Sequence, residues 1–151
     1  MAQSLANVLV HIVFSTKNRY PFLSDKNIRD EMHAYLGGTI NKLDSPVLII
    51  GGYSDHVHIL CRLSRKYSIA KVVGDAKRSS SKWIKTKGEM LTKFEWQNGY
   101  GVFSIGKSET SRIKAYISNQ EEHHRKKSFN DEYRLFLKSY EVEYDERYIW
   151  D

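Results

Sequence analysis

Short apolar runs and longer amphipathic stretches alternate along the first half of the chain. The run from Val8 to Ser15 (VLVHIVFS) is short and β-branched, which predicts a strand in the middle of a sheet. Between Asp25 and Leu43 apolar residues recur at helical spacing, so a helix is expected there. Val47 to Gly52 and His56 to Leu63 are predicted to be two strands of one hairpin.

The second half continues the alternation of helices and strands. Ser68 to Lys85 carries one apolar stripe and predicts a helix, and Tyr100 to Ile105 predicts a fourth strand. Ser108 is expected to cap a further helix that runs to about His124, and a short helix is expected around Asp131 to Tyr140. This order predicts an α+β fold of the ferredoxin-like type. Its split βαββαβ arrangement is an antiparallel sheet with helices on one face, followed here by a C-terminal helix that carries Tyr116.

The composition is that of one ordinary globular domain. The 151 residues, 40% apolar and 28% charged, predict a single domain over 1–151, with a core of about 5–124 and a C-terminal tail of about 125–151. No stretch is long and apolar enough to span a membrane, and the N-terminus predicts a first strand rather than an export signal, so a cytoplasmic protein is expected. The lone Cys61 is expected to be a buried, reduced thiol.

The positive charge of the chain points to a polyanionic partner. The net charge is +6 and the pI about 9.3, and basic surfaces favour phosphates because binding releases condensed counterions. Lys71, Arg78, Lys82 and Lys85 line up on one face of the predicted 68–85 helix. This stripe could contact phosphates, and a merely solvated outer face is the alternative.

Two short motifs carry candidate chemistry. In DHVHIL the strand alternation puts His56 and His58 on one face, where two imidazoles can converge on one cation. Structural histidines on a half-exposed sheet face are the alternative. In the helix after Ser108, Tyr116 and Gln120 are four residues apart and therefore share a face. The alternative for Tyr116 alone is a residue packed on the core.

The combination of these motifs favours a tyrosine nucleophile beside a metal. A phenol has a pKa of about 10, and phosphate oxygens repel an incoming phenolate. A metal ion favours the ionised phenol and withdraws negative charge from the phosphate. Gln120 offers a neutral carbonyl oxygen as a third ligand beside the two imidazoles.

These residues resemble the single-tyrosine HUH transposases of small prokaryotic insertion sequences, including relatives associated with repetitive extragenic palindromes. His56-Val57-His58 matches the HUH motif, and Tyr116-x-x-x-Gln120 matches the nucleophile and third ligand. Further similarity lies in HIVFSTKNRYPF, WQNGYGVFSI, YISNQEEHHRKKSF and YDERYIWD, so the resemblance covers essentially the whole chain.

The resemblance implies a reaction and its partners. Tyr116 would attack single-stranded DNA in hairpin-containing element ends, forming a 5′-phosphotyrosine link and a free 3′-hydroxyl, with no nucleotide cofactor. The divalent metal would be Mg²⁺ or Mn²⁺, and the protein a homodimer in which active sites can be shared between subunits. Candidate DNA contacts are Lys71, Arg78, Lys82 and Arg112.

Several alternatives stay open from the residues alone. The first alternative is another HUH nuclease, such as a replication initiator or relaxase. The second is a module that binds single-stranded nucleic acid without cutting it, and the third is a domesticated transposase. Asp55 could support a ligand histidine, although adjacent strand residues point apart. His123 and His124 are expected to be solvated cations at the helix end.

Overall fold

A four-stranded antiparallel sheet forms the centre of the molecule. The computed structural model describes residues 3–124 and 127–151. The strands are β1 (Leu9–Ser15), β2 (Val47–Tyr53), β3 (His56–Arg62) and β4 (Gly101–Ile105), in the order β2-β3-β1-β4. This is the sheet order of the split βαββαβ unit, so the ferredoxin-like prediction is confirmed.

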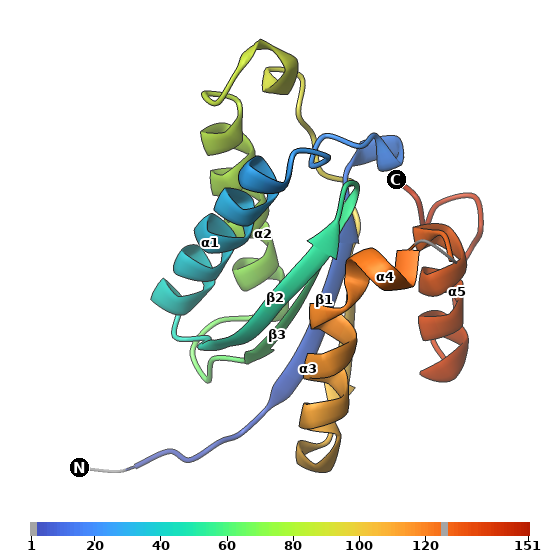
Figure 1. Cartoon of the computed structure of the whole chain (residues 1–151). Helices are drawn as coiled ribbons and strands as arrows, with labels where there is room; N and C mark the ends of the chain where they lie inside the picture. Colours follow the sequence, from blue (N-terminus) through green and yellow to red (C-terminus); the bar gives the residue numbers. More distant parts are fainter. Residues whose placement is uncertain (1–2, 125–126) are drawn as a thin grey trace.

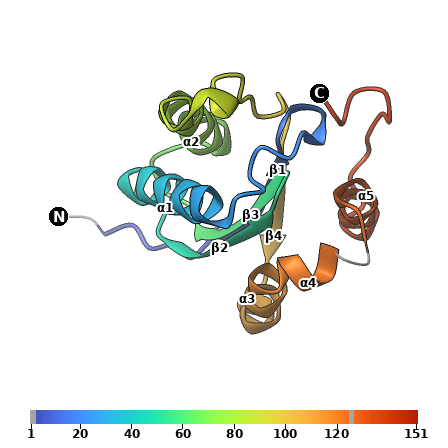
Figure 2. The same ribbon diagram turned by 45° about the horizontal axis from the view of Figure 1, so that its top comes forward.

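Two helices cover one face of the sheet. They are α1 (Lys26–Lys42), capped by the Asp25 side chain, and α2 (Ile69–Ile84), capped by Ser68. Figure 2 shows both helices on the same side of the sheet. Alternate residues of β1 and β3 point into this layer and form the main core with the helices, including Val10, Ile12, Phe14, Val57, Ile59 and Cys61.

The opposite face is covered by the C-terminal helices. These are α3 (Thr110–Ser118), α4 (Gln120–His124) and α5 (Phe129–Ser139), which lie across the sheet from α1 and α2 (Figures 1 and 2). The residues of β1 and β3 that face them are buried as well, because neither side of these strands reaches water. Two smaller apolar clusters join this layer to the sheet, one around Ile117 and one around Phe103.

The helix ends differ from the prediction in three places. Ser108 does not cap α3, because it lies in a short 3₁₀ turn, η3 (Lys107–Glu109), and the position before α3 is Glu109 without a side-chain cap. The helix expected to run to His124 breaks at Asn119, whose φ of −105° and ψ of 27° separate α3 from α4. Finally, α5 begins at Phe129, capped by Ser128, two residues before the expected start.

The chain outside these helices folds back onto the sheet. Two further 3₁₀ turns, η1 (Lys17–Arg19) and η2 (Glu89–Leu91), lie in the connections. The Arg19 guanidinium donates to the Trp150 carbonyl at 3.0 Å, which joins the C-terminal segment to the end of β1. The expected boundary between core and tail at residue 125 lies outside the described residues. Within the described part of the chain, no helix has the length and apolar character needed to cross a membrane.

Candidate metal and tyrosine site

The predicted histidine pair lies at the centre of the face that α3, α4 and α5 cover. The alternation of β3 points His56 and His58 to this face, while Val57 and Ile59 enter the main core. Both imidazoles are fully buried, so the alternative of a half-exposed sheet face is wrong. The sequence could not reveal this burial, because it depends on helices that follow more than 50 residues later.

His56 is oriented by a carboxylate on one side and meets an amide on the other. Its Nδ1 lies 2.8 Å from Asp55 Oδ1, and its Nε2 lies 3.0 Å from Gln120 Oε1. A carboxylate can only accept, so Nδ1 carries the proton and Nε2 of the neutral ring presents a lone pair. Asp55 was expected to point away from the imidazole, but it lies in the turn before β3, where strand alternation does not apply.

The side-chain oxygen Oε1 of Gln120 points towards the Nε2 atom of His56. Gln120 Nε2 donates to the Tyr116 carbonyl at 3.1 Å, which fixes the amide with Oε1 directed into the site. The same Oε1 lies 2.9 Å from His124 Nε2. His124 Nδ1 must donate to the Lys127 carbonyl, at 2.7 Å, so the Nε2 of neutral His124 also presents a lone pair. When both rings are neutral, three electron-pair donors therefore face one another.

A buried carboxylate adds negative charge to this group. Glu132 of α5 is 2% exposed, and its oxygens lie 2.8 Å from the Nε2 atoms of His58 and His123 and 3.1 Å from that of His124. Burial alone would raise the pKa of Glu132, but the nitrogens of His124 and His58 outweigh it and the net shift is downwards. The pKa of His124 is raised, since Glu132, Lys127 and Asp55 outweigh its burial.

The chemistry of these donors fits a divalent cation. Ligand atoms of His56, His58, His124 and Glu132 all lie within 4.8 Å of one another. Imidazole nitrogens, an amide oxygen and a carboxylate oxygen are typical ligands of Mn²⁺ and related ions. Lone pairs that face one another in a buried site repel unless a proton or a cation lies between them.

His58 is held by a second, unpredicted histidine. Its Nδ1 lies 2.8 Å from Nε2 of His11 in β1, which is also fully buried. Burial lowers the pKa of His58 to about 4 and that of His11 to about 3, so both rings are neutral near pH 7. When His58 Nδ1 donates to His11, the Nε2 atom of His58 is left free to bind a cation.

Tyr116 lies beside this cluster in the same chain. Its ring meets His58 edge to face with 5.6 Å between centroids, and the side chain is half-buried. Burial, followed by the negative charge of Glu132, raises the pKa of the phenol above its usual value. The structure thus brings together the four predicted residues, Tyr116, His56, His58 and Gln120.

A glycine in β2 allows the tyrosine helix to approach the sheet closely. A Cβ atom built at Gly51 would lie 2.2 Å from the carbonyl oxygen of Ile117, the residue after Tyr116. Only glycine permits this contact without a shift of the backbone. Ile117 is fully buried, so α3 is packed tightly against its own sheet.

Three residues of the cluster were not predicted from sequence. His124 was expected to be a solvated helix-end cation, but its side chain is 5% exposed and faces the cluster. His11 and Glu132 had no motif to mark them. The available signal for Glu132 was an acid three residues after Phe129 on the apolar face of a short helix.

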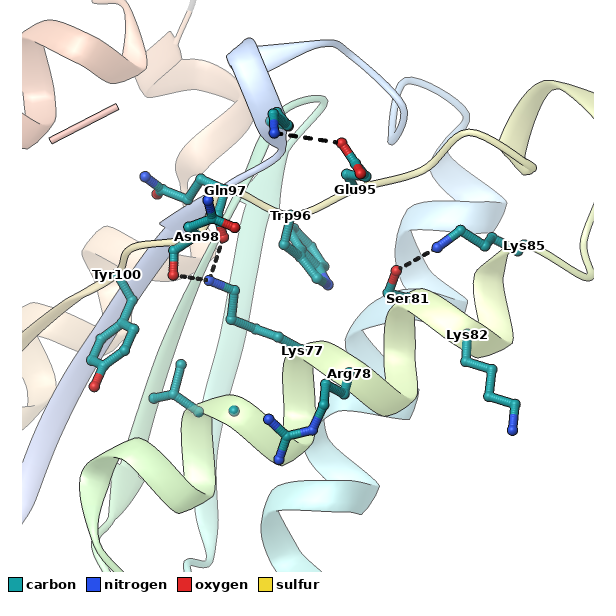
Figure 3. A pocket seen from close by; sticks show the side chains of 13 residues that line it. Lys77, Arg78, Ser81, Lys82, Lys85, Glu95, Trp96, Gln97, Asn98 and Tyr100 are labelled. Atoms are coloured by element: carbon teal, nitrogen blue, oxygen red, sulfur yellow. Dashed lines mark hydrogen bonds and ion pairs between the residues drawn. The ribbon is translucent and has the colours of Figure 1, made fainter. Parts of the chain in front are cut away.

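The candidate DNA contacts fall on two different surfaces. Arg112 pairs with Glu109 and lines the groove that leads to Tyr116 and Glu132. Lys71 and Arg78 both pair with Asp75 on α2. Figure 3 shows the groove beside α2, where Arg78 and Lys82 point outwards and Lys77 donates to the Gln97 and Asn98 carbonyls. Lys82 has no ion pair with any described residue and is available to an external anion.

Acid is expected to destabilise the fold through its neutral histidines. Burial lowers the pKa values of His11, His33 and His58 to about 3, 4 and 4, from 6.5 in the unfolded chain. Below pH 6.5 the unfolded state therefore binds more protons than the native state. As the pH falls, the free energy of unfolding should decrease by up to about 1.4 kcal/mol per pH unit for each of these histidines. The raised pKa of His124 has the opposite effect and offsets part of this loss.

Urea unfolding at pH 7, 6 and 5 measures this dependence. His33 is not one of the clustered ligands, so His33→Gln should reduce the loss of stability by up to about 1.4 kcal/mol per pH unit while every ligand side chain is kept. Equal stability of the parent protein at pH 7 and pH 5 would contradict the assignment of these histidines as neutral.

Comparison with known proteins identifies relatives of the chain. The family model described as "Transposase IS200 like" matches residues 4–120. A comparison with curated proteins found no significant match. Among solved structures, a candidate transposase from Deinococcus radiodurans R1 aligns with a TM-score of 0.62 at 20% identity, over 80% of this chain and 95% of that one. A REP-associated tyrosine transposase bound to a REP hairpin aligns with a TM-score of 0.56 at 11% identity, over 78% of this chain and 70% of that one. At these identities the two structures support the fold.

Proposed function

Because the chain belongs to the IS200-like transposase family, we propose that it cleaves and rejoins single-stranded DNA with Tyr116 as the nucleophile. A divalent cation would be held by His56, His58 and Gln120. The observation that carries this proposal is the convergence of three ligand atoms beside Tyr116. Ligand nitrogens of His56 and His58 lie within 4.8 Å of each other, Gln120 Oε1 lies 3.0 Å from His56 Nε2, and the Tyr116 ring meets that of His58. Such a group of donors next to a phenol is suited to phosphoryl transfer.

The cation is proposed to be Mg²⁺ or Mn²⁺. Two imidazoles favour Mn²⁺ by ligand softness, whereas oxygen ligands suit both ions. When bound, a divalent cation withdraws charge from the phosphate and favours the ionised form of a nearby phenol. This chemistry matches the need of Tyr116, because burial and Glu132 raise the pKa of its hydroxyl.

The proposed cleavage step exchanges one phosphoester for another. A bond forms between Tyr116 Oη and the phosphorus, and the bond from phosphorus to the 3′ oxygen breaks. The phenol loses its proton and the departing 3′ oxygen gains one. Rejoining is the reverse, with a 3′-hydroxyl as the attacking group, and it conserves the phosphodiester linkage without a nucleotide cofactor.

Residues of the chain orient the histidines and the tyrosine for this step. Asp55 fixes the tautomer of His56, and His11 can fix that of His58. The contact of Ile117 with Gly51 holds α3, so that the Tyr116 ring stays beside the histidines. Positioning of this kind supplies much of the rate enhancement when a reaction depends on in-line geometry.

The proposed substrate is single-stranded DNA that contains a hairpin near the ends of a mobile element. The net charge of +6 and the basic side chains Lys71, Arg78, Lys82 and Arg112 support binding to phosphates. The REP hairpin bound by the similar transposase supports the hairpin class of ligand. The reaction is proposed to take place in the cytoplasm, on the element's own DNA.

We propose that the protein is a homodimer in which each Tyr116 serves the histidines of its own chain. The close packing of α3 against β2 supports this arrangement over sharing between subunits. A mixture of Tyr116→Phe and His58→Ala subunits, unfolded and refolded together, is therefore expected to remain without cleavage activity. Restoration of more than a few per cent of parent activity in the mixture would indicate shared sites.

A labelled hairpin oligonucleotide separates the enzyme from a module that only binds. Incubation with Mn²⁺ should produce a protein–DNA adduct that survives denaturing electrophoresis, and EDTA should prevent it. A panel of hairpins with single-stranded flanks is needed, because the target sequence is set by the element. Tight binding with no adduct, under either metal and with every hairpin, would favour the binding module.

A further inference from the structure

The buried face of α5 contains one acid among apolar residues. It consists of Phe129, Glu132, Tyr133 and Leu137. The apolar members pack with Val13 and Phe103 of the sheet. An ionised carboxylate on such a face is costly unless it is paired or binds a cation, so its presence calls for a specific partner.

The chain holds Glu132 against the metal cluster from two sides. Ser128 caps the helix one turn earlier, and Phe129 stacks on the His56 ring with 4.7 Å between centroids and 25° between planes. These contacts fix the start of α5 over the start of β3. The carboxylate consequently reaches His124 Nε2, the same atom that Gln120 of α4 contacts.

Among the described residues, the close partners of Glu132 are imidazole nitrogens and a phenol. They are the Nε2 atoms of His58, His123 and His124 and the hydroxyl of Tyr116. No ion pair joins Glu132 to a lysine or arginine of the described chain. Two of these nitrogens also border the space that the proposed cation would occupy.

We infer that Glu132 is a further ligand of the divalent cation and supplies the one negative charge of its coordination shell. This inference rests on the proposed function, since it adds a carboxylate from α5 to His56, His58 and Gln120. A carboxylate favours hard divalent ions, and a fourth protein ligand still leaves coordination positions for a phosphate oxygen and water. The C-terminal helix thereby becomes part of the active site.

Binding of Mn²⁺ alone, measured by titration calorimetry at pH 7.5, tests the ligand role without any cleavage. In a Tyr116→Phe background, Glu132→Gln should weaken Mn²⁺ binding by at least about 10-fold, the effect seen even for groups that only support metal ligands. Asp131→Asn is the matched control, because it removes the same charge from an exposed neighbour on α5 that pairs with Arg134. This control should change the affinity less than twofold.

Thermal unfolding distinguishes a ligand from a structural residue. The unfolding temperatures of the parent and of Glu132→Gln without metal serve as the two reference values. Addition of Mn²⁺ should raise the unfolding temperature of the parent much more than that of the variant. An equal rise in both proteins would overturn the ligand role.

The outcomes also separate this inference from the proposed function. If His58→Ala loses Mn²⁺ binding while Glu132→Gln keeps the parent affinity, Glu132 is not a ligand and the histidine site stands. If His58→Ala and Glu132→Gln both bind Mn²⁺ as the parent does, or the parent does not bind it, the proposed metal site fails with the inference.

Discussion

Replacement of Tyr116 by phenylalanine should abolish formation of the covalent DNA adduct while hairpin binding persists. The variant lacks only the hydroxyl that would form the bond to phosphorus, and loss of a nucleophile lowers the rate by at least about 10⁴-fold. The ring contacts with His58 and His11 remain, so the fold should be kept. Denaturing electrophoresis measures the adduct, and fluorescence anisotropy measures binding.

Tyr35→Phe is a suitable control for this experiment. Tyr35 stacks on Trp83 between α1 and α2, with 4.8 Å between ring centroids, in the layer on the far side of the sheet from the site. Its substitution should leave adduct formation within about twofold of the parent. Persistence of the adduct in Tyr116→Phe would show that another residue is the nucleophile.

Replacement of His58 by alanine should remove cleavage without removing DNA binding. The imidazole is fully buried, with His11 on one side and Glu132 on the other, and alanine offers no atom that can bind a cation in its place. Loss of a ligand that positions the cation is expected to lower cleavage by about 10³-fold or more. The hairpin Kd should change less than about fivefold, because the residues proposed to contact phosphates are surface cations.

Both quantities are measured on one preparation, with Kd determined in EDTA and cleavage in Mn²⁺. His33→Ala is the control, since His33 lies on α1 outside the metal cluster. Parent-like cleavage by His58→Ala would contradict the metal assignment. A collapse of hairpin binding in both variants would instead indicate a loss of fold, which circular dichroism detects.

The hydrophobic pattern was sufficient to predict the sheet and its order of helices and strands. The strand boundaries of β1, β2 and β3 differ from expectation by one residue, because each is a short β-branched run with clear turn signals on both sides. The cap and the length of α3 were less predictable. Ser108 has the side chain of a cap, but the chain forms a 3₁₀ turn there, and the break at Asn119 depends on tertiary contacts.

The candidate site was predictable only where a short motif relates two of its residues. Strand alternation aligned His56 with His58, and helical spacing related Tyr116 to Gln120. His11 and Glu132 come from two other elements, β1 and α5, and His124 follows Gln120 in α4, so their convergence is a property of the fold. Asp55 was misjudged because the rule for strands was applied to a turn residue.

The proposed function depends on a covalent bond between Tyr116 and DNA. Mass spectrometry of the protease-digested adduct, formed with a hairpin substrate and Mn²⁺, identifies the residue that forms this bond. We expect a nucleotide-derived mass increment on the tyrosine of the peptide that contains Tyr116. An increment on any other residue, or a fully cleaved substrate with an unmodified Tyr116 throughout the reaction, would contradict it.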